Sequence, residues 1–117
     1  MFHSNKIEIR KSSLQGYGVF CTKNIKEGEL LEECHYLEVS DDEKLARYYY
    51  NWPRGEKFKK YTIPLGFGCM YNGTSSSGKE ANVDWKTDVD NDIFIFIAIK
   101  DIKKGSELLL DYDYGEY

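Results

Sequence analysis

The stretch DIKKGSELLLDYDYGEY, residues 101–117, decides how this chain is expected to fold. Gly105 lies in a polar turn, and the run that follows, Glu107 to Leu110, has the length and apolar character of a short buried strand. Acidic residues and tyrosines then alternate through Tyr114. Because a strand this apolar has to be covered by the core, we expect it to deliver Tyr112 into a site that earlier residues build.

The composition is that of one small folded domain. The chain has 117 residues, 41% of them hydrophobic, so we expect a single domain over residues 1–117 with no need of disulfide or metal staples. There are 20 acidic and 16 basic residues, and the net charge is -4. This balance argues against a broad phosphate-binding face, so direct nucleic-acid binding is not expected and a basic partner fits better.

Three widely spaced cysteines, Cys21, Cys34 and Cys69, predict free, buried thiols in a reducing compartment. The longest apolar stretch, residues 93–99, is too short for a membrane span or a signal peptide. We therefore expect a soluble, intracellular protein with no membrane association. The two histidines stand in no triad or metal-ligand pattern, so no metal site is expected.

Two segments with a similar sequence pattern predict a β-rich fold. NIKEGELLE (residues 24–32) and DIKKGSELL (residues 101–109) each place a glycine in a polar turn before an apolar run, which is typical of a corner that leads into a strand. Between them, Ser40 followed by acidic residues predicts a short helix from Asp41 to about Tyr50. Residues 93–99 predict a buried strand.

Three segments are candidates for ligand contact. Gly16-Tyr17-Gly18 would let the backbone approach a ligand closely, although ordinary turns contain such pairs too. The aromatic residues of positions 48–52 could form a wall for an extended ligand or a cationic side chain, or simply pack on the core. Residues 73–79 match a phosphate-binding loop, but Glu80 stands where that loop needs Ser or Thr, so a nucleotide hydrolase is not expected.

Together these segments resemble a SET-domain protein lysine methyltransferase, especially the compact viral and bacterial forms that lack cysteine-rich flanks. The resemblance covers nearly everything from Lys6 to Tyr117 and rests on the order and spacing of LQGYGVFCTKNIKEGELLEE, YYYNW, PLGFGCMYN, ANVDW and IAIKDIKKGSELLLDYDYGEY. It implies a mainly β fold of small curled sheets, with one or two short helices. It also implies a C-terminal pseudoknot, in which the last strand threads beneath the Asn72 loop.

The resemblance also implies an activity and a set of site residues. The protein would transfer a methyl group from S-adenosylmethionine to a lysine of a protein tail such as that of a histone, and would be nuclear if the target is a histone. Tyr112, which ends the family's E-L-x-x-x-Y motif, would be the catalytic residue. The cofactor-binding residues implied are Gly16, Tyr17, Gly18 and Asn72. The residues implied to line the lysine channel are Tyr48, Leu110 and Tyr114.

One departure from the family pattern is visible. Where the family has N-H-S, this chain has Asn72-Gly73-Thr74, which keeps a hydroxyl but loses an imidazole and adds flexibility, a change that bears on cofactor affinity or activity. The alternative interpretation is therefore a SET-like module that binds a peptide or partner with weakened catalysis. Since Tyr117 leaves little chain to cover the cofactor's adenine side, a homodimer in which the second subunit supplies that cover is also an expectation.

Overall fold

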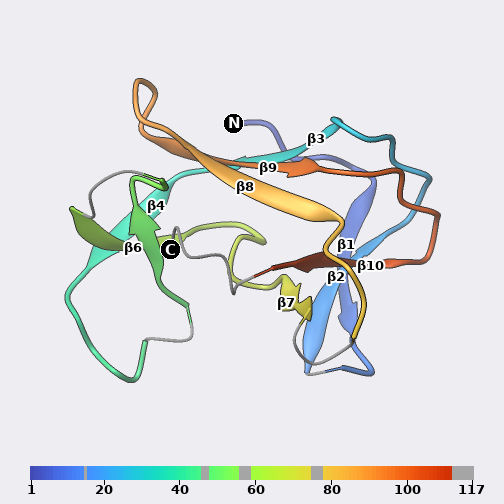
Figure 1. The fold of residues 1–117 in the computed structure, drawn as a ribbon, viewed down its shortest axis with the longest axis horizontal. Helices are drawn as coiled ribbons and strands as arrows, with labels where there is room; N and C mark the ends of the chain where they lie inside the picture. The colour runs from blue at the N-terminus through green and yellow to red at the C-terminus, as the bar shows by residue number, and fades with distance from the viewer. Residues whose placement is uncertain (15, 46–47, 56–58, 75–77, 112–117) are drawn as a thin grey trace.

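The computed structural model describes residues 1–14, 16–45, 48–55, 59–74 and 78–111. This described part of the chain is mainly β, and its strands form three small sheets (Figure 1). In chain order the strands are β1 (Ile7–Lys11), β2 (Tyr17–Cys21), β3 (Leu30–Cys34), β4 (Tyr36–Val39), β5 (Tyr50–Trp52), β6 (Lys60–Pro64), β7 (Asn72–Gly73), β8 (Val83–Asp88), β9 (Ile93–Ala98) and β10 (Glu107–Leu110). The expectation of a mainly β fold of small sheets is confirmed.

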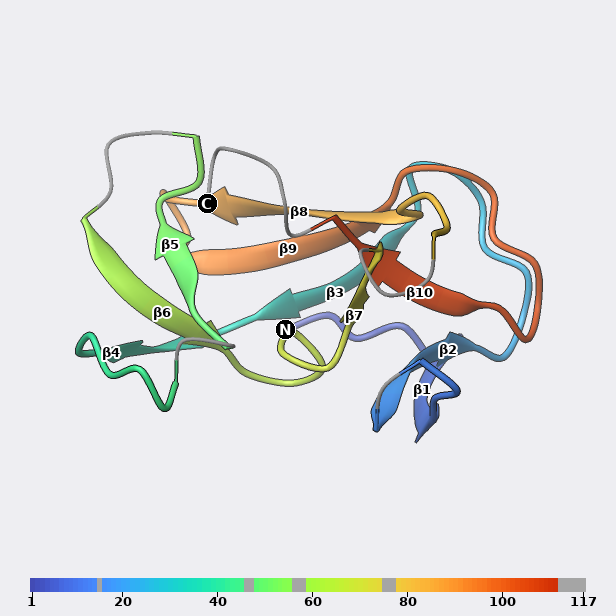
Figure 2. The ribbon, with the colours of Figure 1, turned by 60° about the horizontal axis from the view of Figure 1, so that its bottom comes forward.

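The three sheets follow one another along the molecule. Their strand orders are β1-β2-β10-β7, β3-β9-β8 and β4-β6-β5. Figure 2 shows β3, β9 and β8 in the middle, with β4, β5 and β6 at one end and β1 and β2 at the other. Strands far apart in sequence are therefore neighbours in the first two sheets, which makes the fold dependent on long-range pairing.

The last strand of the described chain lies inside its sheet, between strands from early and middle parts of the sequence (Figure 1). β10 pairs antiparallel with β2, where Glu107 is opposite Phe20, and parallel with β7, where Leu109 is opposite Asn72. This placement leaves Leu108 and Leu110 almost completely buried, as the sequence predicts for this run.

Asn82 acts as a further partner of β10. Its backbone N–H donates to the carbonyl of Leu109 at 3.1 Å, and its side-chain Oδ1 accepts from the N–H of Leu109 at 2.7 Å. Its Nδ2 donates to the carbonyl of Glu107 at 3.0 Å. Both ends of the segment from Asn72 to Asn82 thus contact the last strand, which is the close meeting of strand and asparagine loop that the family resemblance implies.

The two glycine corners pair with each other. Ile25 and Ile102 exchange two backbone hydrogen bonds of 2.9 and 2.8 Å, and both side chains are buried. Gly28 and Gly105 have φ values of 86° and 89°, in the left-handed region that favours glycine. The prediction of two similar corners is confirmed, and their pairing fixes where β3 and β10 begin.

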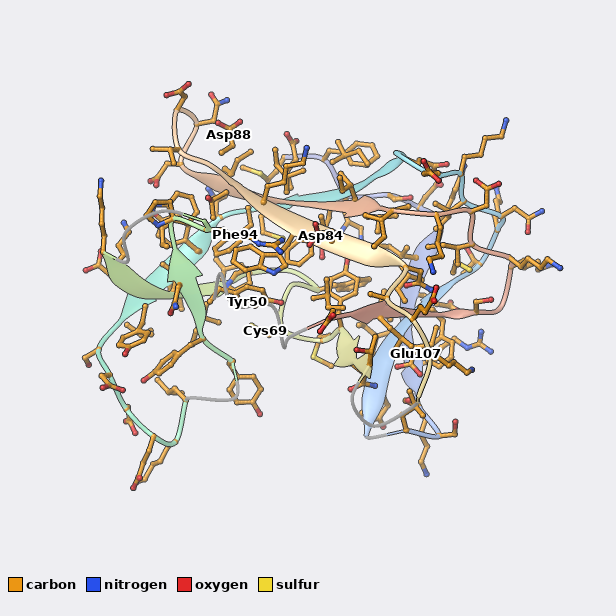
Figure 3. The ribbon with its side chains drawn as sticks, in the orientation of Figure 1. Tyr50, Cys69, Asp84, Asp88, Phe94 and Glu107 are labelled. Atoms are coloured by element: carbon orange, nitrogen blue, oxygen red, sulfur yellow. The ribbon has the colours of Figure 1, made fainter. Side chains whose placement is uncertain are left out.

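The core is rich in aromatic side chains, with β9 at its centre. Phe94 and Phe96 are fully buried, and the ring of Phe94 contacts the rings of Tyr50, Trp52 and Trp85 at centroid distances of 5.2 to 5.7 Å. Figure 3 shows Tyr50 and Phe94 close together between the second and third sheets. The predicted buried strand over residues 93–99 is confirmed as β9, and Tyr50 belongs to the core rather than to an exposed aromatic wall.

The helix expected from Asp41 to about Tyr50 is not formed in the described part of that segment. The N–H of Leu45 donates to the carbonyl of Asp42 and that of Tyr48 to the carbonyl of Leu45, which are turn hydrogen bonds, and Tyr50 already belongs to β5. The acidic residues after Ser40 are typical of a helix start, but burial of Tyr50 against β6 and the core favours an extended chain.

All three cysteines are free, Cys21 and Cys34 being buried and Cys69 partly exposed. Over the described ranges, no helix has the length and apolar character needed to cross a membrane.

Replacing Asn82 tests its clamp on the last strand. The change Asn82→Ala removes two side-chain hydrogen bonds to the backbone of β10, so the free energy of unfolding should fall by about 1–3 kcal/mol. Urea denaturation followed by tryptophan fluorescence measures this. The matched control is Asn91→Ala, whose side-chain amide donates to Asp88 in an exposed turn and which should cost less than about 1 kcal/mol. Equal losses in the two variants would show that Asn82 does not clamp the strand.

Candidate functional site

The candidate site is centred on the side chain of Glu107, at the start of β10. Its Oε2 accepts a hydrogen bond of 2.6 Å from Asn72 Nδ2, and its Oε1 accepts one of 2.8 Å from the hydroxyl of Ser12. Figure 3 shows Glu107 beside β2 and β7. The carboxylate therefore joins the loop after β1 to the segment that carries the predicted cofactor residue Asn72.

Gly18 lets this carboxylate approach the sheet. Gly18 is the second residue of β2, and a Cβ there would collide with Glu107 Oε2 and lie 2.8 Å from Asn72 Nδ2. The second glycine of Gly16-Tyr17-Gly18 is thus required by the packing of two polar side chains against the backbone. Any larger residue has to displace Glu107 or Asn72.

The first two residues of the glycine turn contribute backbone groups. The carbonyl of Tyr17 accepts a hydrogen bond of 3.3 Å from Asn72 Nδ2, while Tyr17 as a whole is 60% exposed. Gly16 has a φ of 48°, and its carbonyl accepts from the N–H of Ser12 at 2.7 Å, which closes the turn. The structure therefore brings the expected cofactor residues Gly16, Tyr17, Gly18 and Asn72 together, where the start of β2 meets β7.

The remaining expected site residues are placed differently. Leu110 is 1% exposed and points into the core together with Leu108, on the opposite face of β10 from Glu107. Tyr48 is 46% exposed, and its carbonyl accepts a hydrogen bond from the thiol of Cys69. No hydrogen bond or ring contact among the described residues joins Tyr48 to Asn72 or Glu107. Tyr112 and Tyr114 lie outside the described residues.

A groove of about 450 Å³ adjoins the site along β10. Glu107 lines it together with Phe20, Asn82 and Leu109, but none of the four expected cofactor residues does. The groove therefore adjoins the glycine turn and Asn72 through Glu107 but does not include them.

Sequence reasoning missed Glu107 and Ser12 as members of the site. Glu107 opens the E-L-x-x-x-Y motif that Tyr112 ends, so its position in the motif was the available signal. Ser12 carries no such signal, because its partner is distant in the sequence and only the fold brings the two together.

The thiols of Cys34 and Cys69 lie near a second carboxylate, that of Glu32 in β3. Burial, followed by the negative charge of Glu32, raises the pKa of Cys69 to about 12. The same two causes raise the pKa of Cys34 further. Both thiols therefore stay protonated at neutral pH and are poor nucleophiles. Within the described ranges, no three His, Cys, Asp or Glu side chains are grouped so as to hold a metal ion.

The small sheets, and a last strand held between a glycine-bearing strand and an asparagine-bearing segment, define a SET-type fold. The chain belongs to the SET domain family, whose model matches residues 16–113. It is 30% identical to a histone-lysine N-methyltransferase of Schizosaccharomyces pombe described as specific for H3 lysine-37, over 91% of this chain and 72% of that protein. It is 32% identical to the variant-silencing SET domain-containing protein of Plasmodium falciparum, over 93% of this chain but 5% of that protein.

Solved structures agree with this assignment. The crystal structure of a proposed histone methyltransferase from Plasmodium falciparum superposes with a TM-score of 0.75, at 29% identity and 96% coverage of both chains. The Cryptosporidium protein CpSET8 superposes with a TM-score of 0.72, over 96% of this chain and 59% of that one. At 24% identity, that second likeness shows the fold alone. The chain is therefore a member of a methyltransferase family.

The close packing at Gly18 can be tested by a double-mutant cycle. Gly18→Ala should lower the free energy of unfolding by about 1–3 kcal/mol, because the added methyl group displaces Glu107. In a Glu107→Ala background the obstacle is gone, so the same change should cost clearly less. Chemical denaturation of the four proteins gives the coupling energy. Additive losses would mean that Gly18 and Glu107 do not compete for the same space.

The raised pKa of Cys69 predicts a pH dependence of stability. The unfolded chain releases this thiol proton near pH 9, whereas the folded chain holds it up to about pH 12. The contribution is therefore complete below about pH 9 and is lost as the pH rises toward 12. Urea denaturation between pH 8 and pH 11 should show a shallower decline for Cys69→Ala than for the wild type. Identical slopes would contradict the raised pKa.

Proposed function

We propose that the chain is an S-adenosylmethionine-dependent protein-lysine N-methyltransferase. The observation that carries the proposal is the position of β10, which brings Glu107 against Asn72 and Gly18. Tyr112 ends the motif that Glu107 opens. Membership of the SET domain family and similarity to a histone-lysine N-methyltransferase support the same activity.

The groups at this site suit the charges of the cofactor. S-adenosylmethionine carries a sulfonium and an ammonium, both positive, beside a carboxylate. The carboxylate of Glu107 and the carbonyl of Tyr17 are acceptors that favour positive groups, and both N–H bonds of the Asn72 amide are directed at these two acceptors and hold them in place. We assign Gly16, Tyr17, Gly18 and Asn72 to cofactor binding, with Glu107 setting the position of Asn72.

The chemistry asked of the protein is modest. When bound, the cofactor supplies an electrophilic methyl group on its sulfonium. The protein's task is to hold a lysine amine in line with that methyl group and to keep water away. The hydroxyl of Tyr112, with nearby backbone carbonyls, orients the methyl group and stabilises its positive charge.

The lysine must lose its proton before it can attack. A channel that excludes water lowers the pKa of a lysine amine, since burial disfavours its charged form, and no histidine base is then required. Tyr48, Leu110 and Tyr114 are the residues we propose to line this channel. The rings of the two tyrosines offer largely apolar surface to the lysine's methylene groups. Leu110 is packed in the core and would only back the channel from inside.

The substrate we propose is a basic protein tail. The net charge of -4 favours approach of a lysine- and arginine-rich segment, chiefly through the rate of association. The fission-yeast relative is described as specific for lysine 37 of histone H3. A histone-like tail is therefore the first candidate, and with such a substrate the protein would act in the nucleus.

The direct test is incubation with S-adenosylmethionine carrying a labelled methyl group and a panel of histone and non-histone peptides. Calorimetry with the cofactor alone runs in parallel. Label in a peptide lysine, located by mass spectrometry, would support the proposal. Binding of the cofactor without transfer to any peptide would favour the alternative module with weakened catalysis. If the protein neither binds the cofactor nor transfers the label to any peptide, the proposal is rejected.

The role of Tyr112 makes a separate prediction. Tyr112→Phe should fold normally but lose about 10²-fold in methylation rate, because only the hydroxyl that orients the methyl group is removed. Tyr36→Phe is the matched control, since it removes a tyrosine hydroxyl that contacts Asp92 and Lys60 away from the site. Rates from a labelled-cofactor assay, with circular dichroism as the check on folding, decide the matter. Unchanged turnover in Tyr112→Phe would show that the assigned role is wrong.

A further inference from the structure

Glu32 is the only charged side chain that is buried among the described residues, with 1% of its surface exposed. It lies in β3, where the register with β9 shifts between Leu30 and Glu32. This bulge allows Leu31 and Glu32 to be buried together, although neighbouring strand residues ordinarily point to opposite faces. A buried carboxylate costs free energy unless it is well hydrogen-bonded, so the hydrogen-bond partners of Glu32 indicate its role.

Two donors to Glu32 come from one short segment between β6 and β7. The hydroxyl of Tyr71 donates to Oε1 at 3.0 Å, and the N–H of Phe67 donates to Oε2 at 3.3 Å. Gly66 begins this segment with a φ of 74°, and a Cβ there would lie 3.0 Å from Glu32 Oε2. The segment therefore wraps around the carboxylate and is held by it at both ends.

The N-terminal residues close the cluster from the other side. His3 Nδ1 lies 3.2 Å from Glu32 Oε2, and the His3 ring packs edge-on against Phe67 at a centroid distance of 4.5 Å. The thiols of Cys34 and Cys69 also lie close enough to Glu32 for its negative charge to raise their pKa values. The Glu32 carboxylate thus lies near one imidazole, one phenol and two thiols, and it is the central acceptor of this cluster.

Tyr71 connects this cluster to the candidate site. Tyr71 is 2% exposed, and its ring stacks on Phe96 at 5.0 Å and 17°. The next residue is Asn72, whose amide contacts Glu107 and the Tyr17 carbonyl. The Tyr71 ring packs inside the core on Phe96 while the Asn72 amide contacts Glu107, so these neighbouring side chains point in different directions. Fixing the phenol of Tyr71 inside the core therefore fixes the direction of the Asn72 amide outside it.

We propose that Glu32 is a positioning residue for Asn72, acting through the hydroxyl of Tyr71. Glu32 itself touches neither substrate nor cofactor. The activity readout rests on the proposed function, but the position of the Asn72 amide can be measured without it. The site would then include, besides the glycine turn and Asn72, a buried carboxylate that belongs to the neighbouring sheet β3-β9-β8.

The central test is Tyr71→Phe, which removes the hydroxyl and keeps the stacked ring. The dissociation constant for S-adenosylmethionine, from calorimetry, should rise roughly tenfold while kcat at saturating cofactor changes less than about twofold. Glu32→Gln keeps an oxygen acceptor for Tyr71 and should show a smaller rise. The control Tyr36→Phe also removes a tyrosine hydroxyl bonded to a carboxylate and should bind the cofactor like the wild type.

A second readout separates this inference from the proposed function. The side-chain amide signals of Asn72, followed by ¹⁵N NMR in the protein without cofactor, should shift and exchange faster with solvent in Tyr71→Phe but not in Tyr36→Phe. If the wild type binds no S-adenosylmethionine, the proposed function fails, yet the NMR comparison still decides the positioning role. Unchanged Asn72 signals in Tyr71→Phe would overturn it, as would equal effects in the two variants.

Discussion

The rest of the structure depends on the pairing of the last strand on both of its edges. β10 is short, yet its backbone pairs with β2 and β7 and also bonds to Asn82. Leu108 and Leu110 point from it into the core, while Glu107 points to the candidate site. Because one strand serves both purposes, the site cannot form before the end of the chain has docked, and loss of that pairing would expose apolar core.

Two carboxylates hold the short segment that carries Asn72 from opposite sides. Glu32 accepts from Tyr71 on the core side, and Glu107 accepts from Asn72 on the outer side. Each carboxylate also binds a group from an early part of the chain, His3 in one case and Ser12 in the other. A two-residue strand has too few backbone hydrogen bonds to fix itself, so side-chain contacts on both faces supply the order that it lacks.

The parts of the fold that follow from local pattern could be predicted from the sequence. The two glycine corners and the buried strand after residue 92 each depend on a few adjacent residues, and the structure confirms both predictions. The prediction of a helix after Ser40 is wrong for the described residues. Capping residues indicate where a helix can start, but they do not account for the burial of Tyr50 in the core, which favours an extended chain. The approach of Glu107 to Gly18 depends on three strands meeting, and no local signal encodes it.

The glycine at position 73, where the SET family has a histidine, affects possible ligand contacts more than it affects the fold. Gly73 pairs through its backbone with Leu110, and the direction of Asn72 is set by the side chains of Asn72 and Tyr71 rather than by the residue that follows. A side chain at position 73 is therefore not needed to hold β7 in place. Its absence removes one group that could touch a ligand and leaves the Asn72 amide, the Tyr17 carbonyl and Glu107 where they are. Because main-chain pairing with Leu110 holds this glycine, the geometry of the site is compatible with cofactor binding without an imidazole at this position.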